Sequence, residues 1–414
     1  MPLPGKCEED WRNLYRDAKP LLNVRYRYEH VDQDGFDKDA NANTIRVRAG
    51  IETGRFYGVG GVAEFQATES IGRERYNSTT NNNTQYPVVA DPDNLELDQL
   101  YLSLDGTIPT TDLKVGRQRV IWDNQRFIGN VGFRQTEQTL DSVRTVTTAV
   151  PDTELEYLYS WRVHRVFGRR SDVGSLPLQT HGFRVHYTGL DVLNITPFGL
   201  LLDYRARSQR SLSSATGGAY LQGDYALNEM WGLQYQGGFA NQQNFANNPN
   251  DFDLWYYAVE PGVSYDFLKG AVGYEVLEGD GDNAFQTPLA TLHKFNGLTD
   301  QFLTTPPDGL QDLYFKLDVA LPTTGLFSDI VLKGGYHEFW AENGGDHYGS
   351  EWDIGVFKTF RLDDADFVLG VQYGDYDADD FSTDTKKIWV SLDFKLGPKP
   401  FRELYAQATA DQSR

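Results

Sequence analysis

The chain has 414 residues and a formal net charge of -21 at neutral pH, which argues against binding nucleic acid or an anionic membrane surface over the whole molecule. Aromatic residues make up 14% of it and there are 40 glycines, whereas cysteine occurs once and methionine twice. No run approaches the roughly 20 consecutive apolar residues that a membrane-spanning helix needs, so a helical membrane protein is excluded. A closed β-barrel is not excluded, because its strands need to be apolar on one face only.

The start of the chain shows no signal for secretion or lipid attachment. No basic segment followed by an apolar core is visible there, so no signal peptide is predicted. Cys7 has no second cysteine with which to form an internal disulfide, and Lys6 directly before it makes a poor lipid-attachment site. We therefore interpret this cysteine as a bystander.

The first strands alternate strictly between apolar and polar side chains. The run LLNVRYRYEHV, which starts at Leu21, places its valine and tyrosines on one face and its arginines on the other. The run TIRVRAGIET, which starts at Thr44, repeats this pattern. Alternation with a period of two predicts strands with one apolar and one polar face. The polar positions of these two strands include Arg25, Arg27, Arg46 and Arg48.

The connections between the predicted strands alternate between long and short along the whole chain. Long polar connections are predicted at 71–94, 121–138, 206–217, 242–252 and 279–310. Further long connections are predicted at 32–43 and after the strands near 153–166, 327–340 and 366–376. Short turns separate the remaining strands, and the count comes to 18 predicted strands of about 10 residues each. Soluble β-sandwiches do not sort their loops by length in this way.

This pattern predicts an all-β fold, a transmembrane antiparallel β-barrel in the bacterial outer membrane. An even strand number, short periplasmic turns and long extracellular loops are the plan of such barrels. The predicted organisation is an N-terminal periplasmic segment at 1–20, a membrane barrel at 21–396 and a C-terminal tail at 397–414. Lipid of the outer membrane is thus one expected partner.

In a membrane barrel the apolar face of each strand must contact lipid, so the alternation assigns many cations to the lumen. One reading is that these cations only pair with neighbouring acids; the other is that they attract anionic solutes. Both can hold together. The predicted lining cations on strands are Arg25, Arg27, Arg46, Arg48, Arg162, Arg184, Lys316 and Lys333.

The stretch from Leu113 to Arg144 combines arginine, amide and aromatic residues between two strand-like runs. Residues 121–138 have no sustained period, so we expect a functional loop at the extracellular end that folds inward and narrows a pore. Arg126 lies within this loop and joins the candidate lining. The alternation is unclear across Gly116, so the face of Arg117 and Arg119 stays open.

Motifs for other chemistries are missing from the sequence. The histidines are scattered without zinc-type spacing, and neither a nucleophile elbow nor a phosphate-binding loop occurs, so we expect no enzyme, no cofactor and no catalytic metal. Asp280 and Asp282 are a weak candidate for calcium, but they do not complete an EF-hand spacing.

Three segments resemble the alginate export family of outer-membrane barrels: KVGRQRVIWDNQRFIGNVGFRQTEQTLDSVR, LHKFNGLTDQFL and YHEFWAENGG. The resemblance implies a monomeric 18-stranded channel that carries anionic polysaccharide or related solutes outward without ATP or a cofactor. It also implies constriction charges at the matching positions Arg117, Arg119 and Lys294. The family's exporter has a long plugging loop late in the barrel, whereas here only Leu362 to Ala365 connects the corresponding strands.

We therefore expect a passive outer-membrane channel with a cationic lumen, which conducts anionic polysaccharide, oligosaccharide or small anionic solutes. A general diffusion porin without a role in alginate transport is the nearest alternative. A barrel-embedded hydrolase and an adhesion barrel with acidic loops are alternatives from different classes.

Overall fold

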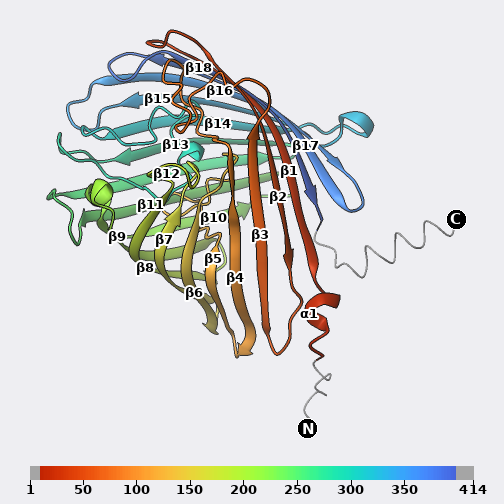
Figure 1. Cartoon of the computed structure of the whole chain (residues 1–414). Coiled ribbons are helices and arrows are strands. Elements are labelled where there is room, and N and C mark those ends of the chain that lie inside the picture. Colours follow the sequence, from red (N-terminus) through yellow and green to blue (C-terminus); the bar gives the residue numbers. More distant parts are fainter. Residues whose placement is uncertain (1–9, 398–414) are drawn as a thin grey trace.

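The computed structural model describes residues 10–397 and shows one antiparallel sheet of 18 strands closed on itself (Figure 1). β1 pairs with β2 on one side and with β18 on the other, which closes the ring. All other pairs join strands that follow each other in the sequence. The predicted 18-stranded antiparallel barrel is thus confirmed, and closure leaves no sheet edge unpaired.

All strands except β5, which has eight residues, reach the length of about 9–11 residues that a tilted membrane-crossing strand needs. They are β1 (Lys19–Gln33), β2 (Ala40–Glu52), β3 (Val59–Ser70), β4 (Asn94–Ile108), β5 (Thr111–Gln118), β6 (Thr139–Val150), β7 (Thr153–His164), β8 (Ser175–Leu190), β9 (Leu193–Tyr204), β10 (Ser214–Ala226), β11 (Trp231–Asn244), β12 (Asp253–Tyr265), β13 (Leu268–Leu277), β14 (Leu310–Ala320), β15 (Ile330–Trp340), β16 (His347–Arg361), β17 (Ala365–Ala378) and β18 (Thr385–Leu396). The helices are α1 (Asn13–Arg16) and the short 3₁₀ turns η1 (Arg207–Leu212), η2 (Leu292–Lys294) and η3 (Gly325–Phe327).

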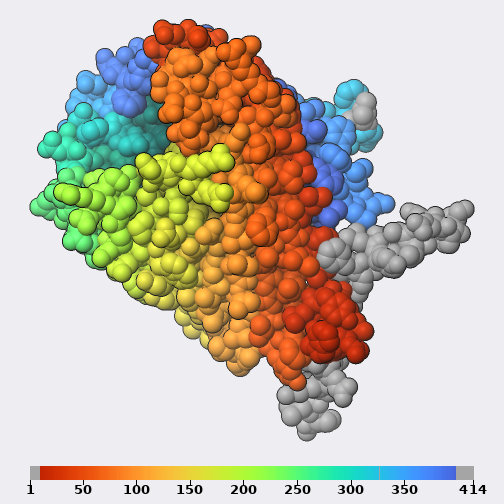
Figure 2. All heavy atoms as spheres, viewed as in Figure 1, coloured from red at the N-terminus to blue at the C-terminus, as the bar shows by residue number. Residues whose placement is uncertain are grey.

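Loop lengths differ between the two ends of the barrel, as the sequence predicts. Long connections such as 71–93, 119–138 and 278–309 leave one end, and the connection at 71–93 covers part of it (orange, top of Figure 2). The short turns and the beginning of β1 lie at the other end (Figure 1). Of the predicted tail only Gly397 belongs to the described residues, and Cys7 lies outside them.

One predicted boundary is wrong, at the connection assigned to 206–217. The structure places η1 there and starts β10 at Ser214, because Gly217 and Gly218 belong to the sheet rather than to a loop. A Cβ atom at Gly218 would lie 2.2 Å from the carbonyl oxygen of Phe239. This glycine therefore serves a close approach between two strands.

The outer face of the barrel is apolar. Large apolar side chains remain exposed there on strands all around the ring, and only lipid accounts for such a surface. They include Phe65, Leu102, Phe183, Phe239, Val259, Val272, Phe315, Ile354, Val371 and Leu392. The fold is thus that of a membrane-spanning barrel.

Among residues 10–397, no helix combines the length and the apolar character needed to cross a membrane.

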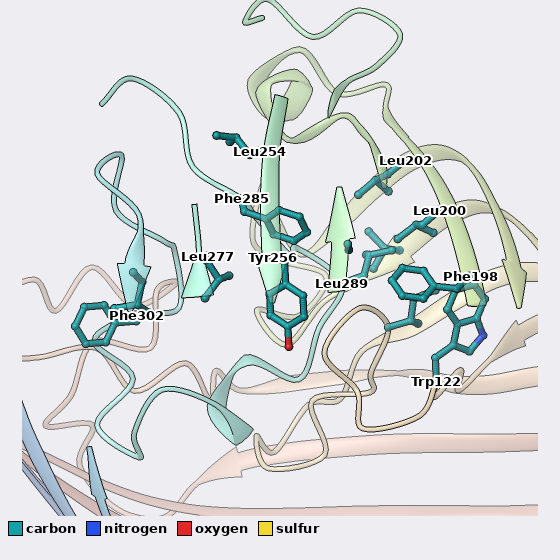
Figure 3. Packing of buried hydrophobic residues seen from close by; sticks show 14 of the residues in the cluster. Trp122, Phe198, Leu200, Leu202, Leu254, Tyr256, Leu277, Phe285, Leu289 and Phe302 are labelled. Carbon is teal, nitrogen blue, oxygen red and sulfur yellow. The ribbon is translucent and has the colours of Figure 1, made fainter. Parts of the chain in front are cut away.

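The interior is packed as well, which the alternation of the strands does not predict. Trp122 of connection 119–138 and Phe285, Leu289 and Phe302 of connection 278–309 belong to one buried cluster (Figure 3). They pack against inward apolar residues of β7 to β13, listed by strand as Leu158, Leu176, Leu178, Phe198, Leu200, Leu202, Leu254, Tyr256 and Leu277. These strands are apolar on both faces because one face contacts lipid and the other contacts the infolded loops.

Candidate functional site

Two long connections fold into the barrel and meet there; we call residues 119–138 inner loop A and residues 278–309 inner loop B. The backbone N–H of Gly129 donates to the carbonyl oxygen of Leu289 at 2.8 Å. The amide of Gln138 donates to the same oxygen at 2.8 Å. The N–H of Thr291 in turn donates to the carbonyl oxygen of Gln125 at 3.1 Å. The sequence predicts that loop A folds inward, whereas for loop B only Lys294 is expected in the lumen, on the strength of the family resemblance.

Inner loop A is held on the wall of β7 and β8 by Trp122. Its indole N–H donates to Glu156 at 2.8 Å, and its ring lies over Gly182. A Cβ atom at that glycine would lie 2.6 Å from the indole, so any side chain there would displace the ring. On the same wall, Arg184 pairs with Asp123 of loop A at 2.8 Å. This predicted lining arginine thus also fixes a loop.

Arginines of β1 hold the other end of loop A. Arg25 donates to the carbonyl oxygens of Gly132 at 2.8 Å and Phe133 at 3.0 Å, and it pairs with Asp393 at 2.7 Å. Arg27 donates to the same Phe133 carbonyl and lies 4.0 Å over the Phe133 ring. Both side chains face inward, as the alternation predicts, but they contact the loop rather than open water.

Arg46, also on this wall, is fully buried. Only 1% of its side chain is exposed, and it lies 3.7 Å from Asp393, the carboxylate that Arg25 contacts. Such a group does not reach a solute in the lumen.

An ionic cluster joins both inner loops to the wall. Arg134 of loop A donates to Glu29 of β1 at 2.9 Å and to Asp300 of loop B at 2.9 Å. Asp300 also accepts from His293 at 2.7 Å and from Lys387 at 3.4 Å. Although burial raises it, these three partners hold the pKa of Asp300 well below its ordinary value. Asp300 therefore stays ionised at neutral pH.

Three buried carboxylates meet beside loop A and are matched by two arginines. Glu137 pairs with Arg48 at 3.2 Å and with Arg119, while Asp98 lies 3.6 Å and 3.5 Å from the same two guanidinium groups. Glu64 lies 3.4 Å from Arg119. Among residues 10–397 this is the one cluster of carboxylates close enough for a metal ion. Because two guanidinium groups already contact these carboxylates, we assign no metal to the cluster.

The calcium candidate from the sequence gathers no such cluster within the described part of the chain. Asp280 instead accepts hydrogen bonds from the N–H groups of Asp282 at 2.9 Å and Asn283 at 2.7 Å, which shapes a turn. Burial raises the pKa of Asp280, but these backbone donors outweigh it and lower the pKa below its ordinary value.

Arg126 is buried at the junction of the two loops. It pairs with Glu275 of β13 at 3.1 Å and donates to Asn296 of loop B at 3.3 Å. Asn296 in turn donates to Glu275 at 2.7 Å and to Asp312 at 3.0 Å. The predicted lining residue of loop A therefore anchors both loops to the opposite wall.

Two predicted lining arginines lie on the outer face. Arg117 shares the register of Leu100 on β4, which is 51% exposed on the outside, and it pairs with Asp141 at 2.8 Å. Arg162 of β7 lies directly opposite Asp141 of β6 and therefore shares its face of the sheet. A β-bulge between Ser160 and Arg162 shifts the alternation of β7, and a pattern with a period of two does not reveal such an inserted residue.

The remaining lining candidates, three lysines, contact an open space. Lys294 of loop B, Lys316 of β14 and Lys333 of β15 border a cavity of about 310 Å³, which we call the lower cavity. Lys316 lies 3.4 Å from Glu260, and Lys333 lies 2.9 Å from Asp318. Burial and neighbouring Lys316 lower the pKa of Lys294. Further polar residues on this cavity are Gln234, Lys269, His293, His337, Asp353 and Gln372.

A second cavity lies on the side of the long loops. This upper cavity has a volume of about 530 Å³ and is bordered by residues of β1, β18 and five connections. His293 of η2 borders both cavities, and Asp300 borders the upper one only. Inner loop B between these two residues therefore separates the two spaces.

The comparison with known proteins gives a fold and no closer relationship. Crystal structures of Pseudomonas aeruginosa OpdK with vanillate and of Acinetobacter baumannii OccAB2 are both 14% identical in sequence to this chain. Their TM-scores are 0.72 and 0.71, and each match covers 92% of this chain and 99% of the other. P. aeruginosa OccK9 (OpdG) gives a TM-score of 0.72 at 13% identity over 93% of this chain and 99% of its own.

The fold is that of an 18-stranded outer-membrane barrel. No family model matches the sequence, and no curated protein matches it either.

Proposed function

We propose that the protein is a passive channel of the bacterial outer membrane that conducts small anionic solutes. The observation that carries this proposal is the lower cavity, where Lys294, Lys316 and Lys333 border open space while the arginines are engaged elsewhere. An 18-stranded barrel is wide enough for an aqueous path, and cations along such a path raise the local concentration of anions. Inner loops A and B narrow the path between the two cavities.

Small anions are favoured over large ones by two observations. The inner loops fill part of the interior with a buried apolar cluster, and the two cavities that they border measure about 310 and 530 Å³. In addition, OpdK, whose fold is similar, was crystallised with vanillate, a small organic anion.

Transport of an anionic polysaccharide such as alginate is the second candidate. It rests on the sequence resemblance and on Lys294, which stands in the LHKF segment and borders the lower cavity. Of the other two matching positions, Arg117 faces outward and Arg119 is held by three carboxylates. An oligouronate that blocks chloride current at micromolar concentration would favour this candidate over the first.

The reversal potential of the purified protein in planar bilayers under a KCl gradient tests the main proposal. We expect an anion-selective parent, and a shift toward cations when Lys294, Lys316 and Lys333 are replaced together by glutamine. Lys386→Gln is the matched control, because Lys386 is exposed beside the inward Lys387 and should leave the reversal potential unchanged. A parent without anion preference would indicate a general diffusion porin, and a parent without current would contradict the channel altogether.

A further inference from the structure

Three exposed apolar side chains cannot be explained by lipid. Phe36, Val88 and Leu303 are 38%, 45% and 43% exposed, and they lie in three different connections rather than on the outer face of a strand. All three border the upper cavity. Loops that only surround a water-filled opening have no structural reason to place apolar side chains around the same cavity. An exposed apolar patch of this kind is typical of a binding site.

One cation on the same cavity has no anionic partner. Arg165, in the connection between β7 and β8, borders the cavity, and its guanidinium lies 4.9 Å over the ring of Phe167. Within residues 10–397 no carboxylate oxygen lies within 4.0 Å of it. The other two cations on this cavity, Arg134 and Lys387, both contact Asp300. Arg165 is therefore the charge available to a bound solute.

We propose that the upper cavity is a binding site for a small solute that carries one carboxylate on an apolar, ring-sized body. The body packs on Phe36, Val88 and Leu303, and the carboxylate pairs with Arg165, whose planar guanidinium suits two parallel hydrogen bonds. A volume of about 530 Å³ lies within the usual range for such ligands. The proposed channel function is needed only to explain how the solute leaves this site, and binding at the site does not depend on it.

The composition of the cavity separates this solute class from two others. A saccharide would place hydroxyl groups against the apolar wall, which costs their hydrogen bonds to water. An inorganic anion such as chloride would leave the same wall exposed and gain nothing from it. Neither uses both halves of the site.

Titration calorimetry with the purified full chain in detergent tests the site with three probes: benzoate, acetate and benzyl alcohol. Benzoate offers both the ring and the charge, whereas each of the other two offers one of them. We expect benzoate to bind at least about tenfold more tightly than either, since one charge-assisted contact or one buried ring is each worth a factor of this size.

Variants separate the two halves. Arg165→Gln should weaken benzoate about tenfold, and Arg165→Lys should restore part of the loss. Phe36→Ala should weaken benzoate without changing acetate. The matched control is Arg170→Gln, because Arg170 is exposed in the same connection and does not border the cavity. Retention of β-structure by circular dichroism shows that each variant is folded.

Equal affinities for benzoate and acetate, or equal losses in Arg165→Gln and Arg170→Gln, would overturn the site. Chloride current in bilayers, measured on the same preparation, separates it from the channel proposal. Current without discrimination between the probes overturns the site alone. Benzoate binding that depends on Arg165 in a protein without current supports the site and overturns the channel alone.

Discussion

Two walls of the barrel carry inward cations and use them differently. On the wall of β1 and β2, arginines such as Arg27 and Arg48 are buried and contact inner loop A or its carboxylates. On the wall of β14 and β15, the side chains of Lys316 and Lys333 are 42% and 52% exposed to the lower cavity. Cations on the first wall fix loops, and those on the second wall border open space beside Glu260 and Asp318.

The difference follows from the chemistry of the two side chains. A guanidinium group offers several donors in one plane, so it can satisfy a carboxylate and a loop carbonyl at once in a dry environment. An ammonium group is compact and strongly hydrated, and it favours a position where water reaches it. The number of cations assigned to a lumen therefore does not measure how cationic the path is.

Arg134→Gln should produce the largest effect, because it leaves the buried Glu29 and Asp300 without their shared partner. Breaking a buried pair costs about 3–5 kcal/mol, enough to release loop A from the wall. We expect faster hydrogen exchange across 121–138 and a larger, noisier single-channel current. Lys333→Gln is the control, since its half-exposed pair with Asp318 contributes about 1 kcal/mol or less. Similar hydrogen exchange across 121–138 in both variants would contradict the different roles of the cations on the two walls.

The pH dependence of stability should show a smaller effect, through Asp300. Its folded-state pKa lies below the ordinary value, so its contribution is complete above about pH 4 and is lost as the pH falls through the folded pKa. The difference in unfolding free energy between the parent and Asp300→Asn should be constant near neutral pH and shrink below pH 4. Urea unfolding in lipid vesicles over a pH series measures it.

The control for this series is Asp318→Asn, whose side chain is 41% exposed. It should change the unfolding free energy little at any pH. A difference for Asp300→Asn that grows as the pH falls would contradict the sign derived from its partners.

Arg117→Gln should have the smallest effect on conduction. Arg117 lies on the outer face beside Asp141, away from both cavities. We expect Arg117→Gln to have the same reversal potential as the parent, whereas the variant with all three lysines replaced shifts toward cations. A shift as large as that of the lysines would place Arg117 in the path and restore the constriction that the family resemblance implies.

The fold could be predicted from the sequence almost completely, whereas the site could be predicted only in part. Alternation with a period of two is a local property, so it assigned faces correctly for Arg25, Arg27 and Lys316. It failed at Arg162, because the bulge before it inserts one residue without any visible signal in the sequence. It also left undecided whether an inward arginine meets water or a loop.

The stretch 113–144 shows the same division. Its lack of periodicity indicated a loop with a function, and the alternation of loop lengths put it at the long-loop end. Only the structure shows that loop B packs against it and that their shared apolar cluster and ion pairs fill the interior.

The sequence by itself determined the closed barrel, its strand number and the end at which the long loops lie, because neighbouring strands and their turns encode these features locally. Tertiary structure alone decided which cations are buried, which border the cavities and where the two inner loops meet. Those outcomes depend on contacts such as that between Arg134 and Asp300, which lie 166 positions apart in the chain.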